Sequence, residues 1–186
     1  MPPKVKITKE DIIHTAVDIV RKNGELAINA RTIASVLNCS TQPIFSNFAT
    51  MDELRFAALE KANAIYEEFS IREMASGKYP PYKASGMAYI RFAKDEKELF
   101  KFLFMRDRSE ETLRRESGFD SRTLDLVCRN TGLDPSGAQL FHLQMWACVH
   151  GIATMFATGF CDLEWELVSK MLSDAYLGHK KLYGME

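Results

Sequence analysis

The sequence predicts an all-α protein with a small N-terminal domain and a larger helical body. Apolar residues recur every three to four positions through most of the chain, and no stretch shows the sustained two-residue alternation of a half-buried strand. Capping residues and proline-bearing turns divide the periodic stretches into helices. With 186 residues, 46% of them hydrophobic, the chain is long enough to bury a core. We expect a three-helix domain in residues 1–50 and a helical bundle domain in residues 51–186.

The first helix is expected over residues 9–22. Thr8 followed by Asp11 has the spacing of a capping box, and Asn23 with Gly24 ends the pattern. Between these signals the apolar side chains share one side of a 3.6-residue repeat: Ile12, Ile13, Ala16, Val17, Ile19 and Val20.

A second, short helix follows, with Asn29 as its N-cap and Asn38 placed to close it. Its apolar residues Ile33, Ala34 and Leu37 are expected to face inward. Its polar residues then face solvent: Arg31, Thr32 and Ser35.

The stretch CSTQPIFSNF, residues 39–48, predicts a third helix capped by Ser40. Pro43 then lies in the first turn, where its missing N–H removes no ladder hydrogen bond. Ile44 and Phe48 are expected to pack inward beside Phe45. The remaining residues form an outer face of short polar groups and one rigid ring: Thr41, Gln42, Pro43, Ser46 and Asn47.

The rest of the chain is also helical in pattern. Thr50 with Glu53 repeats the capping-box spacing and opens a long helix to about Ser76, which GKYPPY ends. Helices near 82–93 and 95–106 precede a charged loop, RDRSEETLRRESG, and a helix near 120–130. Asp134 and Pro135 open a long apolar helix to Gly159, and the last helix is expected over 162–182.

Composition excludes several classes of protein. No apolar run approaches about 18 residues, and the N-terminal MPPKVKITKED lacks the apolar region of a secretory signal, so no membrane partner and a cytoplasmic location are expected. The net charge is −1, divided as +2 in residues 1–50 and −3 in the remainder, which points only weakly to nucleic acid.

The four cysteines are Cys39, Cys128, Cys148 and Cys161, too widely spaced for a disulfide scaffold and without a CxxC pair. We expect buried free thiols at these positions, and the sequence leaves open whether one of the four cysteines senses redox state. HExxH, GxGxxG and GxxxxGK are absent, so no cofactor and no metal are expected.

A short helix, a turn of about three residues and a further helix with an exposed polar face form a helix-turn-helix, whose last helix can lie in the major groove of DNA. Residues 33–54, IASVLNCSTQPIFSNFATMDEL, resemble the TetR family of bacterial transcriptional regulators. The resemblance covers about residues 8–60. Residues 146–151, WACVHG, are similar to a Trp-x-x-x-His-Gly stretch on the penultimate helix of one TetR subgroup.

The chain departs from the family pattern at four positions. Asn38 replaces the turn glycine and still tolerates the left-handed conformation, and Cys39 replaces the turn valine. Phe45 replaces the tyrosine of the recognition helix, and Met51 replaces the lysine that opens the fourth helix in many relatives. The two last changes remove groups that often reach DNA phosphates.

The helix-turn-helix supplies candidate DNA-binding residues. Gln42 and Asn47 can hydrogen-bond to base edges, and Pro43 can lie against a thymine methyl group. Asn29, Arg31, Thr32, Lys4 and Lys6 suit phosphates, although Arg31 can equally be a solvated surface charge. The full predicted set is Asn29, Arg31, Thr32, Thr41, Gln42, Pro43, Phe45, Ser46 and Asn47.

For the body, the resemblance implies a homodimer joined through the last two helices and a pocket for a small-molecule effector. Small residues near one stripe of the long helix would admit another helix: Ala147, Gly151, Thr154 and Thr158. Aromatic and sulfur side chains can line a pocket, but such residues at helical spacing also form solid core, and His150 is either a polar anchor or a core histidine. The candidates are Tyr66, Phe69, Tyr89, Phe92, Phe102, Met105, Met145, Trp146 and His150.

Two other functional classes are weighed against a regulator. An enzyme has little support, because Cys148 and His150 are two residues apart on a helix and do not face each other. A helical adaptor that binds only protein would account for the body but not for the polar helix-turn-helix face. The predicted function is a ligand-responsive, TetR-like regulator, most often a repressor in that family, which binds a partly palindromic operator in double-stranded DNA.

Overall fold

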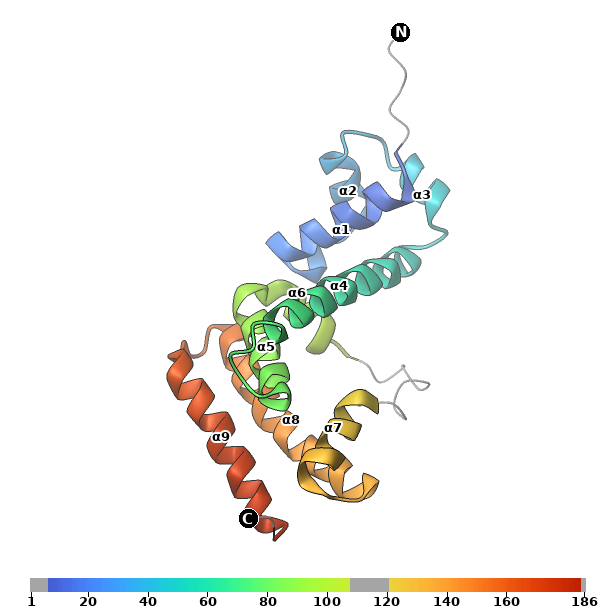
Figure 1. The fold of residues 1–186 in the computed structure, drawn as a ribbon. Coiled ribbons are helices and arrows are strands. Elements are labelled where there is room, and N and C mark those ends of the chain that lie inside the picture. Colours follow the sequence, from blue (N-terminus) through green and yellow to red (C-terminus); the bar gives the residue numbers. More distant parts are fainter. Residues whose placement is uncertain (1–6, 108–120, 185–186) are drawn as a thin grey trace. The chain divides into compact units, whose positions relative to one another are not determined.

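The computed structural model describes residues 7–107 and 121–184 (Figure 1). Over these residues the chain is helical without any strand, which confirms the all-α class. Nine α-helices occur in this described part: α1 (Lys9–Asn23), α2 (Ala30–Val36), α3 (Gln42–Asn47), α4 (Met51–Met74), α5 (Pro81–Asp95), α6 (Lys97–Phe104), α7 (Ser121–Thr131), α8 (Pro135–Thr158) and α9 (Trp165–Leu182).

Most helix boundaries lie within two residues of those expected from capping residues. The last helix is an exception, because it begins at Trp165 and not at residue 162. Glu164 is its N-cap and has an extended backbone. The charged segment RDRSEETLRRESG, predicted as a loop, lies almost wholly outside the described residues.

The chain forms two compact units. The N-terminal unit combines Met1–Glu68 with Glu96–Arg106, and the C-terminal unit combines Phe69–Asp95 with Asp107–Glu186. Helix α4 therefore begins in one unit and ends in the other. The division into functional domains at residues 50 and 51 stays a prediction, because it concerns what each part does.

Helix α1 is the centre of the N-terminal unit and packs against α2, α3 and α6. Its apolar stripe is fully buried at Ile12, Ala16 and Val20. The predicted capping box is present: Thr8 Oγ1 accepts a hydrogen bond from Asp11 N at 3.1 Å, and Asp11 Oδ2 accepts one from Thr8 N at 2.9 Å. The Thr8 hydroxyl also donates to Asp11 Oδ2 at 2.6 Å, and this bond, followed by the one from Thr8 N, lowers the pKa of the Asp11 carboxyl.

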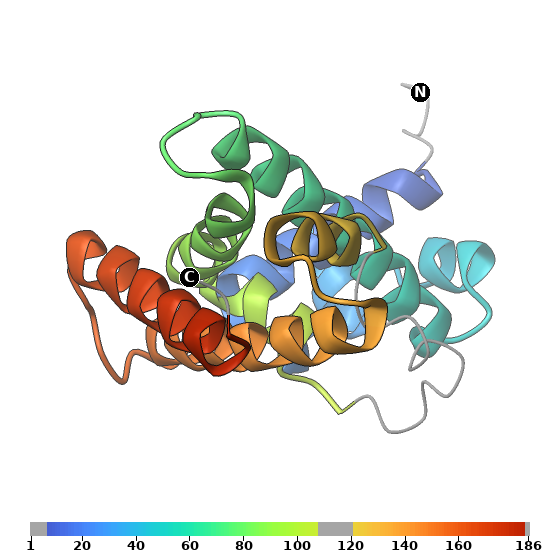
Figure 2. The same ribbon diagram turned by 60° about the horizontal axis from the view of Figure 1, so that its bottom comes forward.

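Helix α8 is the centre of the C-terminal unit, where it packs against α5, α7 and α9. Figure 2 shows α9 running beside it. Asp134 Oδ1 caps α8 through Gly137 N at 2.8 Å, and Gly159 ends the helix with a φ of 70°. At Gly86 on α5 an added Cβ would lie 3.2 Å from Val149 Cγ2, so this glycine permits α5 and α8 to approach closely.

Helix α8 is long and apolar enough to cross a membrane by length and composition alone. Its apolar residues nevertheless build the core of the C-terminal unit, where Phe141, Ile152 and Phe156 are at most 2% exposed. The core helix of a water-soluble protein passes the same compositional test, so α8 is assigned to the core.

Candidate nucleic-acid interface and effector cavity

Helices α2 and α3 form the predicted helix-turn-helix. Asn29 Oδ1 accepts a hydrogen bond from Thr32 N at 2.9 Å and so caps α2. Asn38 has a φ of 50°, the left-handed conformation expected where the family pattern has glycine. Cys39 N then donates to Ala34 O at 2.9 Å, which satisfies a carbonyl at the end of α2.

The start of α3 differs from the prediction. Thr41, and not Ser40, is the N-cap, and its side chain makes no capping hydrogen bond. Thr41 has helical dihedral angles, and its carbonyl accepts from both Ile44 N and Phe45 N at 3.2 and 3.3 Å. The first turn is therefore closed by backbone bonds alone. Pro43 still lies in this first turn, where no ladder bond is lost.

Helix α3 buries a single narrow stripe. Ile44 is 1% exposed and Phe48 is 2% exposed, as predicted. Phe45 is 52% exposed, so the prediction that it packs inward is wrong. Helix α3 is only six residues long and packs against α1 through the stripe that holds Ile44, and the Phe45 side chain points about 100° away from Ile44 around the helix. The exposed ring becomes part of the outer face.

The outer face of the helix-turn-helix holds the candidate DNA-binding residues. Asn29, Arg31, Gln42, Phe45 and Ser46 are exposed. Thr32, Thr41, Pro43 and Asn47 are half-buried. Lys4 and Lys6, predicted to suit phosphates, lie outside the described residues.

Two of these polar side chains are bonded to their own helix. Ser46 Oγ donates to Gln42 O at 2.9 Å, and Asn47 Nδ2 donates to Pro43 O at 2.7 Å. Within the described part of the chain, the side-chain amide of Gln42 makes no hydrogen bond. Gln42 therefore offers its full set of donors and acceptors to a partner, whereas Asn47 retains one N–H and its oxygen.

The start of α4 is anchored to α1. Thr50 Oγ1 accepts from Glu53 N at 3.1 Å, and Glu53 Oε2 accepts from Ala49 N at 2.8 Å. The backbone hydrogen bond from Ala49, followed by the ion pair with Lys9, lowers the pKa of Glu53. Lys9 Nζ also lies 4.7 Å from the centre of the Phe48 ring. This cluster holds the link between α3 and α4 in place.

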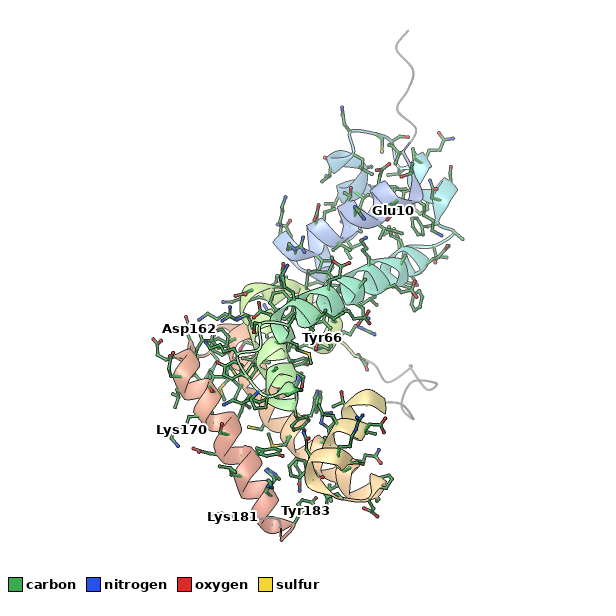
Figure 3. The ribbon with its side chains drawn as sticks, in the orientation of Figure 1. Glu10, Tyr66, Asp162, Lys170, Lys181 and Tyr183 are labelled. Atoms are coloured by element: carbon green, nitrogen blue, oxygen red, sulfur yellow. The ribbon has the colours of Figure 1, made fainter. Side chains whose placement is uncertain are left out.

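The nine sequence-predicted pocket residues divide between the two units. Tyr66, Phe102 and Met105 belong to the N-terminal unit, and the others to the C-terminal unit. The Tyr66 ring, labelled in Figure 3, packs edge-on against Phe104 at 5.1 Å between ring centres. Four of the nine are core residues at most 7% exposed: Tyr89, Phe92, Phe102 and Met145.

The C-terminal unit brings together a polar group among these candidates. Tyr89 Oη and His150 Nδ1 are 2.9 Å apart, and the Trp146 ring stacks on the His150 ring at 4.7 Å. A second Tyr–His pair of the same kind is present, with Tyr82 Oη and His142 Nδ1 also 2.9 Å apart. Burial lowers the pKa of both histidines below 6.5 and raises the pKa of Tyr82. These pairs cross-link α5 and α8.

Sequence reasoning missed the Tyr82–His142 pair, although a signal was available. His142 and His150 are eight residues apart on α8, and Tyr82 and Tyr89 are seven apart on α5. Both spacings place side chains on one face of a helix, so two neighbouring helices can pair them twice.

A cavity of about 460 Å³ lies in the C-terminal unit. Its floor is made of buried Ala84, Met87 and Ala88 on α5, and Ser76 and Lys78 are exposed at its rim. Glu73, Tyr79 and Arg91 complete the lining. None of the nine sequence-predicted pocket residues lines this cavity.

The sequence matches a known family through its C-terminal part. Residues 82–173 match the family described as tetracyclin repressor-like, C-terminal domain. A comparison with curated protein sequences gave no significant match. The fold is similar to the crystal structure of the multidrug binding protein EbrR complexed with imidazole, with a TM-score of 0.56 and 17% identity over 90% of this chain and 88% of that chain. The chain therefore belongs to the TetR family of transcription regulators.

Proposed function

We propose that this regulator binds a partly palindromic operator in double-stranded DNA as a homodimer and acts as a repressor, and that a small-molecule effector controls the binding. The observation that carries the proposal is the outer face of α3. On this face the side-chain amide of Gln42, which makes no hydrogen bond among the described residues, lies beside Pro43 and Ser46. The left-handed Asn38 lies in the turn that precedes this helix. Such a helix fits the major groove, where amides read adenine and apolar groups read the thymine methyl.

The homodimer is supported by an apolar stripe on the outer side of α8. Leu140 is 50% and Leu143 is 45% exposed, and Ala147 and Gly151 are exposed next to them. A Cβ added at Gly151 would meet nothing within 4 Å. Helix α9 adds exposed Leu167 and Leu177. Contiguous exposed apolar side chains mark interaction surfaces, and small residues allow helices of two chains to approach closely.

An effector site is supported by the size of the cavity under Tyr79 and Met87, which is within the range of about 300–1,000 Å³ typical of ligand pockets. The structurally similar EbrR is described as multidrug binding, which is consistent with an effector of this kind.

The test is selection of DNA by the full chain from a random duplex pool, repeated with Gln42→Ala. A regulator of the proposed kind should enrich one short, nearly two-fold symmetric site, and Gln42→Ala should weaken binding to that site more than binding to random DNA. Enrichment of no sequence, or of an asymmetric single half-site by a chain that sediments as a monomer, contradicts the proposal.

A further inference from the structure

The cavity beside α5 lies in the most basic segment of the described chain. Residues 69–95 carry five basic side chains against Glu73 and Asp95, a net charge of +3 in a protein whose total is −1. The five are Arg72, Lys78, Lys83, Arg91 and Lys94. A low-dielectric cleft surrounded by one sign of charge concentrates ligands of the opposite sign.

Two of these cations line the cavity itself. Lys78 stands at the rim, and no carboxylate of the described residues lies within ion-pair distance of it. Its ammonium group is 5.4 Å from the centre of the Tyr79 ring, and Lys83 Nζ is 5.2 Å from the same ring. The aromatic wall of the cavity is therefore flanked by two ammonium groups.

The second cation, Arg91, is held loosely by its carboxylate partner. Arg91 Nε and Glu73 Oε2 are 3.4 Å apart, longer than the roughly 2.7–2.9 Å of a strong charge-assisted hydrogen bond. The two side chains are 39% and 31% exposed, so water screens the pair. An incoming anion with better geometry can replace Glu73 at the guanidinium.

The other face of Arg91 is fixed by an aromatic ring. Its guanidinium carbon lies 4.8 Å from the centre of the Trp165 ring at the start of α9. Trp165 in turn stacks on Phe156, and Lys94 donates to Asp162 Oδ1 at 2.6 Å in the connection before α9, where Asp162 is labelled in Figure 3. Arg91 is therefore preorganised and can change its anionic partner without moving far.

We propose that this cavity takes a small organic anion with an apolar body, whose carboxylate-like head lies between Lys78 and Arg91 and displaces Glu73. The body lies on Met87, Ala84 and Tyr79. A cation would meet two like charges here and only one carboxylate. The inference rests on the proposed effector control, which it deepens by naming the chemical class of the ligand.

Three probes with the same body separate the alternatives: 4-phenylbutanoate, 4-phenylbutanamide and 4-phenylbutylamine. Calorimetric titration of the full chain should show the carboxylate binding at least about ten-fold more tightly than the amide or the amine. Lys78→Gln and Arg91→Gln should each weaken carboxylate binding about ten-fold. Glu73→Gln should tighten it, because the competing carboxylate is removed.

The matched control is Lys170→Gln, which removes an exposed lysine on α9 that pairs with Asp174 and should leave all three affinities unchanged. Trp165 supplies a second readout, since replacing Glu73 at Arg91 should alter indole fluorescence in the native chain but not in Trp165→Phe. Thermal unfolding of each variant shows that it is folded.

The proposal is overturned if the amide or the amine binds as tightly as the carboxylate, if Glu73→Gln weakens carboxylate binding, or if no carboxylate binding is seen at millimolar concentration. Because the titration contains no DNA, its failure is distinct from failure of the operator selection. If the chain selects an operator but does not bind the carboxylate, the anion proposal is wrong and the proposed operator binding still stands.

Discussion

The hydroxyl oxygen of Tyr89 and Nδ1 of His150 lie 2.9 Å apart, and the two residues belong to α5 and α8 of the C-terminal unit. Tyr89 is 7% exposed, so this hydrogen bond forms largely out of water. The histidine ring is also covered by Trp146, which stacks on it. The WACVHG stretch thus supplies the two stacked rings, Trp146 and His150, and α5 supplies the hydrogen-bonding Tyr89.

Removal of the Tyr89 hydroxyl should destabilise the fold. Tyr89→Phe leaves the half-buried His150 nitrogen with one partner fewer, and loss of such a hydrogen bond typically costs about 0.5–1.5 kcal/mol. The free energy of unfolding in urea measures the loss. Tyr183→Phe is a suitable control, because its hydroxyl donates to Gln144 Oε1 over a long 3.4 Å. If the two variants lose the same free energy of unfolding, the Tyr89–His150 hydrogen bond stabilises the fold no more than the long Tyr183–Gln144 bond does.

Stability should fall as the pH falls below 6.5. Burial lowers the pKa of His142 and His150 in the folded state, whereas the unfolded chain keeps the ordinary value. About one pH unit or more above 6.5 these rings are almost entirely neutral in both the folded and the unfolded state. Below pH 6.5 the unfolded state binds more protons at these rings than the folded state does. The free energy of unfolding therefore decreases as the pH falls from 6.5 to the lower pKa of the folded state.

Urea unfolding at about pH 7.5 and about pH 5.5 measures this effect. The difference in unfolding free energy between the two values should shrink in His142→Gln and in His150→Gln, because glutamine does not titrate. His14→Gln is the control, since His14 is half exposed on α1. An unchanged pH dependence in both His142→Gln and His150→Gln would contradict the prediction.

Gln42→Ala should cost about 1–3 kcal/mol on the preferred operator and much less on random DNA, because a base-edge contact is lost. Asn47→Ala should cost less than Gln42→Ala, since one amide N–H of Asn47 is already bonded to Pro43 O. Fluorescence anisotropy on both duplexes checks this. Equal losses on specific and random DNA would exclude base reading by these residues.

Met51→Lys should tighten binding to specific and random DNA alike. Met51 is the first residue of α4 and is half-buried, so a lysine there can extend towards a DNA backbone beside α3. Each added phosphate contact steepens the dependence of log affinity on log salt by about 0.9. Phe45→Tyr is the control, because a neutral hydroxyl leaves the slope unchanged. If Met51→Lys alters neither affinity nor slope, residue 51 does not approach a phosphate.

Gly151→Arg should convert a dimer into a monomer and leave the fold intact. The position is exposed, and a Cβ added there meets no atom of the described residues within 4 Å, so an arginine can point into solvent and obstruct a second copy. Sedimentation velocity measures the state, and helical circular dichroism measures the fold. Glu60→Arg, an exposed position on α4 and outside the α8 stripe, is the control. A Gly151→Arg dimer would place the interface elsewhere.

Local sequence was enough to determine the helices and most of their ends. Thr8, Asn29 and Asp134 each cap a helix as expected, because an N-cap bonds to backbone atoms only two or three residues away. The helix-turn-helix followed for the same reason, since Asn38 provides the left-handed turn by itself.

Only the tertiary structure decided which side chains meet. Phe45 is exposed because α3 packs along one stripe, and Thr41 replaced Ser40 as the N-cap because backbone bonds closed the turn. The cavity is lined by Glu73 of α4 and Arg91 of α5, and Arg91 also packs on the Trp165 ring of α9. Periodicity shows which face of a helix is apolar, but it does not show which other helix that face meets. The pairing of Tyr89 with His150, 61 residues apart, therefore depends on how α5 and α8 pack.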